Sequence, residues 1–273
     1  MRRFNLLIVK IMSLLFLVLC FMIPVDMVRD LIRDRQFYQS QVEQELTKST
    51  SGEQTIAAPI LVVPYQLVEG KTRTEQRLIV LPEQLNIDGQ VQVSPLKRAI
   101  YTFQTFQSTT ALTGHFSRAP LQTLRAKKGV TLGTPFLAVG VSDARGLGKS
   151  EPFTWAGKRY TFSAGTQLHA LPNGMHAALP LSDWDIAGSA PLNFSIQLNV
   201  NGSSRISYVP LGENTQVTLA GNWPHPKFAG STVTQTRNVM PQGFNASWQS
   251  NWFANNLNTT LPSIENSTAN GGN

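Results

Sequence analysis

A long, nearly continuous apolar run near the N-terminus constrains this chain more than any other feature. Residues 4–25 have the sequence FNLLIVKIMSLLFLVLCFMIPV, with Asn5, Lys10 and Ser13 as the clear polar interruptions. A helix needs about 20 apolar residues to cross a hydrocarbon core of about 30 Å. Lys10 lies near one end, from which its ammonium can reach the headgroups. The sequence therefore predicts a membrane-spanning helix over residues 6–26, after a cytoplasmic leader of residues 1–5.

Two other interpretations of this run fit less well. A cleaved signal peptide requires small residues at its cleavage site, but the segment from Phe21 to Met27 contains no pattern of that kind. A buried core helix of a soluble domain would carry polar residues along one face, and this run does not. We therefore expect an uncleaved anchor.

The positive charges that set orientation are balanced, with three on each side of the span. They are Arg2, Arg3 and Lys10 before it, and Arg29, Arg33 and Arg35 after it. A short basic leader before an apolar run is typical of an export signal, so we expect a cytoplasmic N-terminus and an external main domain. The single cysteine, Cys20, leaves the rest of the chain without a thiol, which suits an oxidising compartment.

Residues 27–50 are predicted to form a helical stalk that continues from the membrane. Apolar residues recur there at three- and four-residue steps, as in Val28, Leu31, Ile32, Tyr38, Val42 and Leu46. We expect this stalk to be a spacer, a helix that binds a partner, or a helix packed on the next domain.

Residues 51–257 are predicted to form a β-rich domain, because their apolar stretches are short and are separated by Gly, Pro and Asn. The clearest alternation runs from Leu192 to Val200, with a polar residue at every second position. It leads into Asn201-Gly202, a strong two-residue hairpin signal, and Ala156-Gly157 marks a second hairpin. A helix is possible at 120–128. No strand–helix alternation is visible, so we expect mainly antiparallel sheets in a sandwich-like domain. The polar residues 258–273 are expected to form a flexible tail or to mark a truncation.

Charge and motif patterns argue against nucleic acid and nucleotide as partners. Lys and Arg number 23 against 16 Asp and Glu, a net charge of +7 that is spread along the chain. The segment Gly146-Leu147-Gly148-Lys149-Ser150 resembles the end of a P-loop. However, Asp143 stands in the place near the motif's start where Gly is required, and Pro152 follows where a helix should begin.

Catalytic and metal signals are weak, so we predict no catalytic residue, no metal and no cofactor. The histidines form no HxxxH or HExxH pattern. His169 and His176 lie across a turn and would need Asp183 or Asp185 as a third ligand. Asp183 and Asp185 could also form a carboxylate pair of the kind that glycosidases use, which keeps an envelope-polymer hydrolase as an alternative.

Aromatic residues give the most distinctive pattern in the second half of the chain. The segment from Asn222 to Phe228 places a histidine between two prolines, and residues 243–253 follow with two tryptophans. These residues predict either core packing or a surface that binds a peptide, a glycan or the membrane interface. The candidate surface consists of Trp223, His225, Phe228, Trp248 and Trp252. Trp248 and Trp252 could share one helical or one strand face.

Several segments resemble the inner-membrane protein CreD family, known as cell envelope integrity proteins. They are residues 49–52, Gly133-Thr134-Pro135-Phe136, 142–148, Asn222-Trp223-Pro224-His225-Pro226 and 248–256. The resemblance implies an N-terminal anchor, a large periplasmic domain and further membrane helices. It also implies expression under a Cre-type two-component system, with effects on envelope integrity and colicin tolerance. It implies no established catalytic residues. No comparable apolar run follows residue 30, so we expect a fragment or a truncated relative.

These observations predict an inner-membrane protein with a periplasmic β domain. We expect it to support envelope integrity and the stress response under a two-component system, by binding a partner rather than by catalysis. The partner could be an envelope protein or a glycan. A glycan- or lipid-binding periplasmic module is the main alternative.

Overall fold

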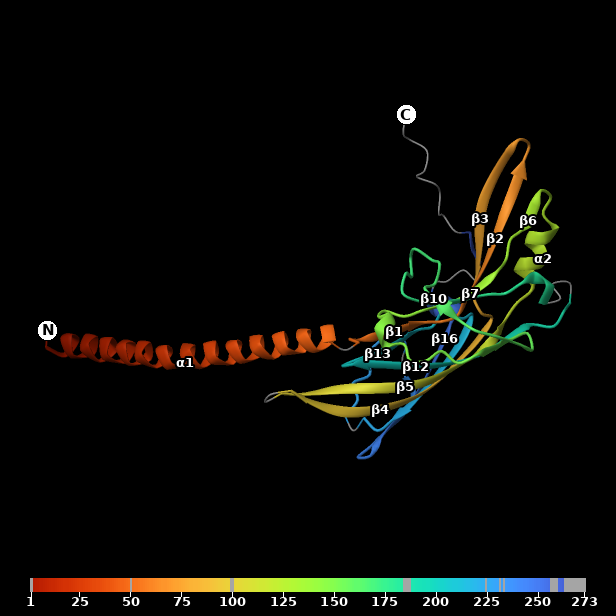
Figure 1. Cartoon of the computed structure of the whole chain (residues 1–273). Helices are drawn as coiled ribbons and strands as arrows, with labels where there is room; N and C mark the ends of the chain where they lie inside the picture. The colour runs from red at the N-terminus through yellow and green to blue at the C-terminus, as the bar shows by residue number, and fades with distance from the viewer. Residues whose placement is uncertain are drawn as a thin grey trace. The chain divides into compact units, whose positions relative to one another are not determined.

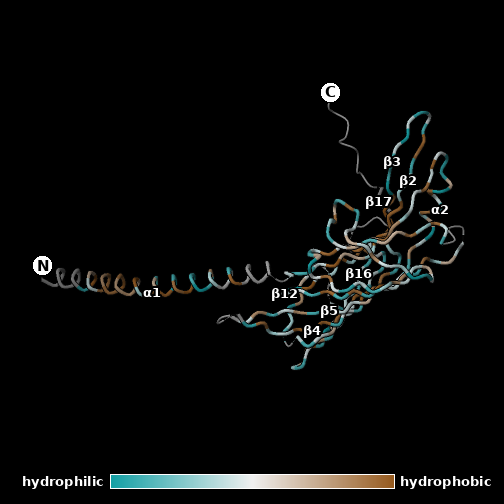
Figure 2. The backbone as a smooth tube through the Cα atoms, viewed as in Figure 1, coloured by the Kyte–Doolittle hydropathy of each residue, from teal (hydrophilic) through white to brown (hydrophobic). Residues whose placement is uncertain are grey.

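The computed structural model describes residues 2–49, 51–98, 101–183, 188–223, 225–230, 232, 234–255 and 260–262. The chain divides after Ser49 into two compact units. The first unit is helix α1 (Arg2–Ser49), which continues through Pro24 without a break. Its stretch Lys10–Val42 is long and apolar enough to cross a membrane, judged by length and composition. Figure 2 shows this hydrophobic part of α1 giving way to hydrophilic residues further along the helix. The residues predicted as span and stalk thus belong to one helix.

The second unit consists mainly of strands, as Figure 1 shows. The larger sheet has eight strands, in the spatial order β15 (Thr234–Met240), β16 (Gly243–Asn251), β14 (Asn214–Gly221), β4 (Gln84–Arg98), β5 (Tyr101–Phe116), β12 (Leu192–Ser203), β8 (Phe153–Trp155) and β9 (Lys158–Tyr160). The second sheet has the order β10 (Ser163–Ala164), β11 (Gly174–Ala178), β7 (Phe136–Gly140), β2 (Ile60–Glu69), β3 (Thr72–Val80) and β17 (Thr260–Pro262), with β6 (Val130–Leu132) also paired to β2.

Antiparallel pairing dominates both sheets, which confirms the predicted fold class. Strand β14 runs parallel to β4. A separate parallel pair joins β1 (Gln54–Ala57) to β13 (Ile206–Val209). The short helices α2 (Ala119–Ala126) and α3 (Trp252–Asn255) and the 3₁₀ turns η1 (Ala144–Gly146) and η2 (Leu181–Asp183) complete the described elements.

One hydrophobic core draws side chains from both large sheets, in a sandwich-like arrangement. The alternation predicted for β12 buries Leu192, Phe194, Ile196, Leu198 and Val200, while the residues between them are more exposed. They belong to the same cluster as buried side chains of β2 and β7 in the other sheet. Each such side chain stabilises the fold by about 1.5–3 kcal/mol relative to an exposed position.

The hairpin predicted at Asn201-Gly202 is wrong. Strand β12 continues through both residues, which pair with Gln107 and Phe106 of β5. Glycine is needed at position 202 for close packing, because a Cβ there would lie 2.5 Å from Cζ of Phe106. The chain turns two residues later at Ser204, where φ is +63°. Strand β13 then pairs with β1 instead of returning along β12.

Other local predictions are confirmed. Ala156 and Gly157, with φ of +46° and +82°, form the two-residue turn between β8 and β9. The helix expected near 120–128 is α2, which buries Leu121.

The flexible tail predicted for residues 258–273 is wrong at Thr260–Pro262, which form β17 and pair with β3. The remaining residues of that segment lie outside the described part.

Candidate functional site: an aromatic groove

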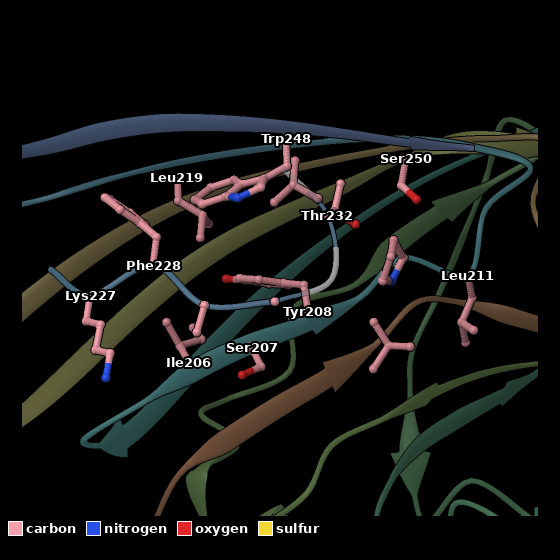
Figure 3. A pocket seen from close by; sticks show the side chains of 15 residues that line it. Ile206, Ser207, Tyr208, Leu211, Leu219, Lys227, Phe228, Thr232, Trp248 and Ser250 are labelled. Carbon is pink, nitrogen blue, oxygen red and sulfur yellow. The ribbon is translucent and has the colours of Figure 1, made fainter. Parts of the chain in front are cut away.

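A half-open groove of about 590 Å³ lies at one end of the eight-stranded sheet. We call it the aromatic groove and define it by Tyr208, Leu219, Phe228 and Trp248. Figure 3 shows Phe228, Leu219 and Trp248 along one side, with Tyr208 and Ile206 facing them. Lys227 lies at one end of the view and Leu211 at the other. The volume is within the range of about 300–1,000 Å³ that is typical of small-molecule sites.

Strand periodicity explains why these side chains meet. Alternate residues of a strand point to the same face of a sheet, so Trp248 and Ser250 of β16 share a face with Phe244 and Ala246. The antiparallel register places Val217 of β14 opposite Trp248. Leu219, Phe244 and Ala246 form a small core, separate from the main one, against which Tyr208, Phe228 and Trp248 pack. The groove is therefore an extension of a stable hydrophobic cluster.

Residues 227–230 and Thr232, which follow β14 in the chain, form the outer wall of the aromatic groove. The segment that leads to them from β14 includes Pro226, which cannot donate a backbone hydrogen bond to a neighbouring strand. At its start, the side chain of Asn222 accepts a hydrogen bond from the Val93 amide (2.6 Å) and donates one to the Val93 carbonyl (3.1 Å). These bonds hold the segment on the edge of β4 at the point where β14 ends. The chain can then pass across the sheet to place Phe228.

Tyr208 supplies the polar anchor of the groove. Its hydroxyl lies 2.8 Å from Oγ1 of Thr110 and 3.4 Å from Oγ of Ser108, two residues of β5 whose side chains are buried. Burial raises the pKa of Tyr208, against the opposing effect of its bonds to Ser108 and Thr110. The phenol is therefore neutral at physiological pH and serves as a structural part of the wall.

Contacts between aromatic rings hold the side of the groove that faces Tyr208. The rings of Phe228 and Trp248 lie 5.6 Å apart between centroids and are tilted by 60°. The rings of Phe228 and Phe244 meet in an edge-to-face arrangement with centroids 5.6 Å apart. The guanidinium of Arg237, a residue of strand β15, lies 5.1 Å from the centroid of the Phe228 ring. Contacts of this kind contribute about 0.5–1.5 kcal/mol each beyond simple burial. Phe228 is therefore held in place from several sides.

The structure separates the five residues of the predicted surface. Phe228 and Trp248 come together in the groove. Trp223 is partly buried and packs on the small core instead, and His225 is exposed. Trp252 begins α3, and its ring lies 4.3 Å from that of Phe253 between centroids, tilted by 42°. Trp248 therefore lies on a strand and Trp252 on a helix, and they do not share one face of either element.

Asp183, a candidate catalytic carboxylate, is engaged in surface contacts. It accepts hydrogen bonds from Nζ of Lys158 (3.0 Å) and from the hydroxyl of Tyr160 (3.1 Å). The bond from Lys158 is the largest cause that lowers the pKa of Asp183. Burial, followed by the bond to Asp183, raises the pKa of Tyr160 to about 12. A general acid needs a raised carboxyl pKa, so Asp183 has the opposite bias. Asp185 lies outside the described residues.

The histidines occupy different settings. The Nδ1 of His176 lies 2.6 Å from the Gly165 carbonyl, and its Nε2 lies 2.7 Å from Nε2 of Gln167. Both ring nitrogens of His176 are therefore engaged by neighbouring protein atoms. His169 is exposed in the preceding turn. Within the described ranges, no group of three or more His, Cys, Asp or Glu residues could hold a metal ion.

The segment that resembles a P-loop is a tight turn. The Asp143 side chain accepts a hydrogen bond from the Arg145 amide and caps η1, and this contact matches the turn that the sequence predicts at residues 142–148. The amide of Gly148 donates to the Asn199 carbonyl at 2.7 Å. A Cβ at Gly146 would lie 2.3 Å from Nε2 of Gln54. The Gly148 amide, which a P-loop would direct at a phosphate, is thus bonded within the fold.

Sequence reasoning missed Tyr208, Leu219 and Lys227 as groove residues. Val217 and Leu219 show the two-residue alternation of a strand, which indicates a buried face but not what covers it. Tyr208 and Phe228 pack over that face, and such contacts with distant segments leave no local signal. Lys227 was inside the segment that the sequence singled out, so its position next to Phe228 was the available clue.

Comparisons with known proteins agree with the apolar helix, because they point to a family of inner membrane proteins. The family model described as inner membrane protein CreD matches residues 6–272. This chain belongs to that family. It is also 38% identical over 256 residues to the inner membrane protein CreD of Escherichia coli strain K12. That match covers 91% of this chain and 56% of the relative, so the chain spans about half the length of the curated protein it matches.

A solved structure also shows a partial likeness to the chain. It is an M1 zinc metallopeptidase from Deinococcus radiodurans, crystallised as a mutant bound to a Tyr-Ser-Ala substrate. The likeness has a TM-score of 0.29 and 11% sequence identity, and it covers 63% of this chain and 39% of the peptidase.

Proposed function

We propose that this CreD-family chain is an envelope protein that α1 anchors in the inner membrane and that acts by binding through its β domain. The N-terminus is cytoplasmic and the β domain is periplasmic. The domain supports envelope integrity and the stress response under a two-component system. Family membership and the apolar helix support the location. The aromatic groove is the single observation that carries the binding role.

Binding is favoured over catalysis by the chemistry of the described residues. The groove is lined mainly by apolar and aromatic side chains, together with a few hydroxyls and Lys227. Of the two carboxylates that the sequence offered for hydrolysis, Asp183 is paired with Lys158 on the surface, and Asp185 lies outside the described residues. An apolar groove with few polar groups suits recognition, whereas acyl or glycosyl transfer needs a nucleophile or an acid–base pair in a cleft.

Photo-crosslinking in living cells tests the binding role. A benzoylphenylalanine at Ala229, an exposed residue of the groove wall, is compared with the same probe at Gln216, an exposed residue of β14. We expect a discrete adduct at Ala229 that is absent at Gln216. Equal labelling at the two positions, or none at Ala229, would contradict a binding role for the groove.

A functional comparison separates binding from catalysis. Trp248→Ala removes a groove wall, whereas Asp183→Asn removes the candidate carboxylate. We expect cells that carry the first variant to lose resistance to an envelope stress such as detergent, and cells that carry the second to retain it. Protein level is measured by immunoblot in both strains. A loss confined to Asp183→Asn would instead favour an enzyme.

Orientation is tested with a membrane-impermeant maleimide. The natural Cys20 lies in the apolar part of α1, so a cysteine placed at Ala229 reports on the β domain. We expect labelling of the Ala229→Cys variant once the outer membrane is permeabilised, and no further increase after lysis. Labelling only after lysis would place the domain in the cytoplasm.

A further inference from the structure

We propose that the aromatic groove binds an acyl chain of an anionic membrane lipid. This inference rests on the binding role proposed above and names the ligand class for the same site. The lining offers an apolar channel between Leu219, Phe228 and Trp248 on one side and Ile206 and Tyr208 on the other (Figure 3). A flexible hydrocarbon chain can fill such a channel without directional contacts.

The chemistry of the lining favours hydrocarbon over sugar or peptide. A glycan site needs several side chains that bond sugar hydroxyls, but the Tyr208 hydroxyl is directed to Thr110 and Ser108 inside the fold. Ser207, Thr232 and Ser250 are the other hydroxyls of the lining. Apolar surface therefore supplies most of the contact, and its removal from water drives the binding of an apolar ligand.

The charges at the groove select an anionic headgroup. Lys227 is exposed at one end, and Arg237 lies close by against the outer ring of the wall, Phe228. Among the described residues that line the groove, Lys227 carries the charge and none is acidic. A lipid whose chain lies along Phe228 and Trp248 would thus place its phosphate near Lys227 and near no carboxylate of the lining. Zwitterionic lipids gain less from this arrangement because their own ammonium offsets the phosphate.

The membrane is the source of the ligand to which the proposal commits. The family model is that of an inner membrane protein, and α1 has the length and composition of a membrane span. A domain tethered to a bilayer has lipid available at high local concentration. A groove of moderate affinity would therefore be occupied.

A photoreactive lipid tests the proposal directly. The full chain is reconstituted in vesicles that contain phosphatidylglycerol with a diazirine in one acyl chain, and adducts are mapped by mass spectrometry. Matched vesicles carry the same diazirine in phosphatidylcholine. We expect adducts on peptides that contain Phe228 and Trp248, with a higher yield from phosphatidylglycerol. Adducts on α1 are expected in both and serve as an internal standard.

Three variants make the result specific. Ala229→Trp fills the mouth of the groove from an exposed position, and Asn238→Trp adds the same side chain at an exposed position of β15. We expect groove adducts to disappear in the first and persist in the second. Lys227→Gln should reduce the phosphatidylglycerol adduct by about two- to fivefold, the effect of losing one exposed ionic contact.

The alternatives give distinguishable results. If α1 is labelled but the groove is not, while crosslinking at Ala229 in cells captures a protein, then the lipid proposal is overturned and the binding role stands. Equal groove adducts from both lipids, unchanged by Lys227→Gln, overturn the choice of an anionic headgroup. If neither lipid nor cellular crosslinking labels the groove, both proposals fail together.

Discussion

Replacing Gly202 by alanine tests the finding that β12 runs straight through the expected turn. The new Cβ would lie 2.5 Å from Cζ of Phe106, 2.8 Å from Cγ of Gln54 and 2.9 Å from the Gly52 carbonyl oxygen. Neither side chain can move away easily, because Phe106 is 2% exposed and Gln54 is fully buried. Overpacking of this kind costs about 1–3 kcal/mol.

A hydrogen bond is also at risk in this variant. The side chain of Gln54 donates to the Asp143 carbonyl at 3.1 Å, and its displacement would remove about 1 kcal/mol. The total loss is therefore about 2–4 kcal/mol. At about 2–4 °C per kcal/mol for a domain of roughly this size, the midpoint of thermal unfolding should fall by about 4–16 °C.

The neighbouring substitution Asn201→Ala is the matched control. Asn201 is exposed in β12, so its loss should change stability by less than about 0.5 kcal/mol. In a two-residue hairpin turn, both Asn and Gly would be needed for positive φ, and both variants would be destabilised. Unfolding is followed by tryptophan fluorescence and circular dichroism of the full chain in micelles. Equal losses in the two variants, or a neutral Gly202→Ala, would refute the strand assignment.

Three further predictions follow from other parts of the fold. Ala156→Gly should stabilise the β domain by about 0.5–1 kcal/mol, because Ala156 has a φ of +46° that glycine adopts without strain; a lower unfolding midpoint in the same melt would contradict this. Leu112→Ala should cost about 3–5 kcal/mol, because Leu112 is fully buried in the main core, and a loss no greater than that of the exposed Thr109→Ala would refute its core position. Arg145 lowers the pKa of Asp143 below its ordinary 3.8, so the stabilising contribution of this carboxylate is complete above that value and is lost as pH falls through the lowered pKa. Urea unfolding between about pH 4 and pH 2 should therefore be less pH-dependent in Asp143→Asn, and identical slopes would contradict the prediction.

Patterns among neighbouring residues predicted many of the strands and turns of the fold. The alternation from Leu192 to Val200 identified a strand with one buried face, and Ala156-Gly157 identified a turn, because side-chain periodicity and positive φ are properties of a few neighbouring residues. Asn201-Gly202 misled for the same reason. The pair is favourable for a turn, but the packing of Gly202 against Phe106 and Gln54 depends on segments far away in the sequence.

The candidate site was predictable only in part. The aromatic segment indicated Phe228 and Trp248, and the structure brings both into the groove. It did not indicate Tyr208, whose position follows from the pairing of β13 with β1. Nor could it separate Trp252 from Trp248, since that depends on where β16 ends and α3 begins. Aromatic composition identifies a region, while strand register selects the residues that share a face.

The order of strands in the sheets differs strongly from their order in the chain, and this affects how the domain is made. One edge of strand β4 cannot pair until β14 has been synthesised, because Gln84 pairs with Asn214. Likewise, Leu78–Val80 of β3 pair on their outer side with residues 260–262. During synthesis, backbone groups on both strands stay unpaired until much later segments emerge, and open strand edges are sites of aggregation. A chain with such distant pairings folds slowly, so the domain should depend on chaperones that hold the unfinished chain until residues 214 and 260–262 are available for pairing.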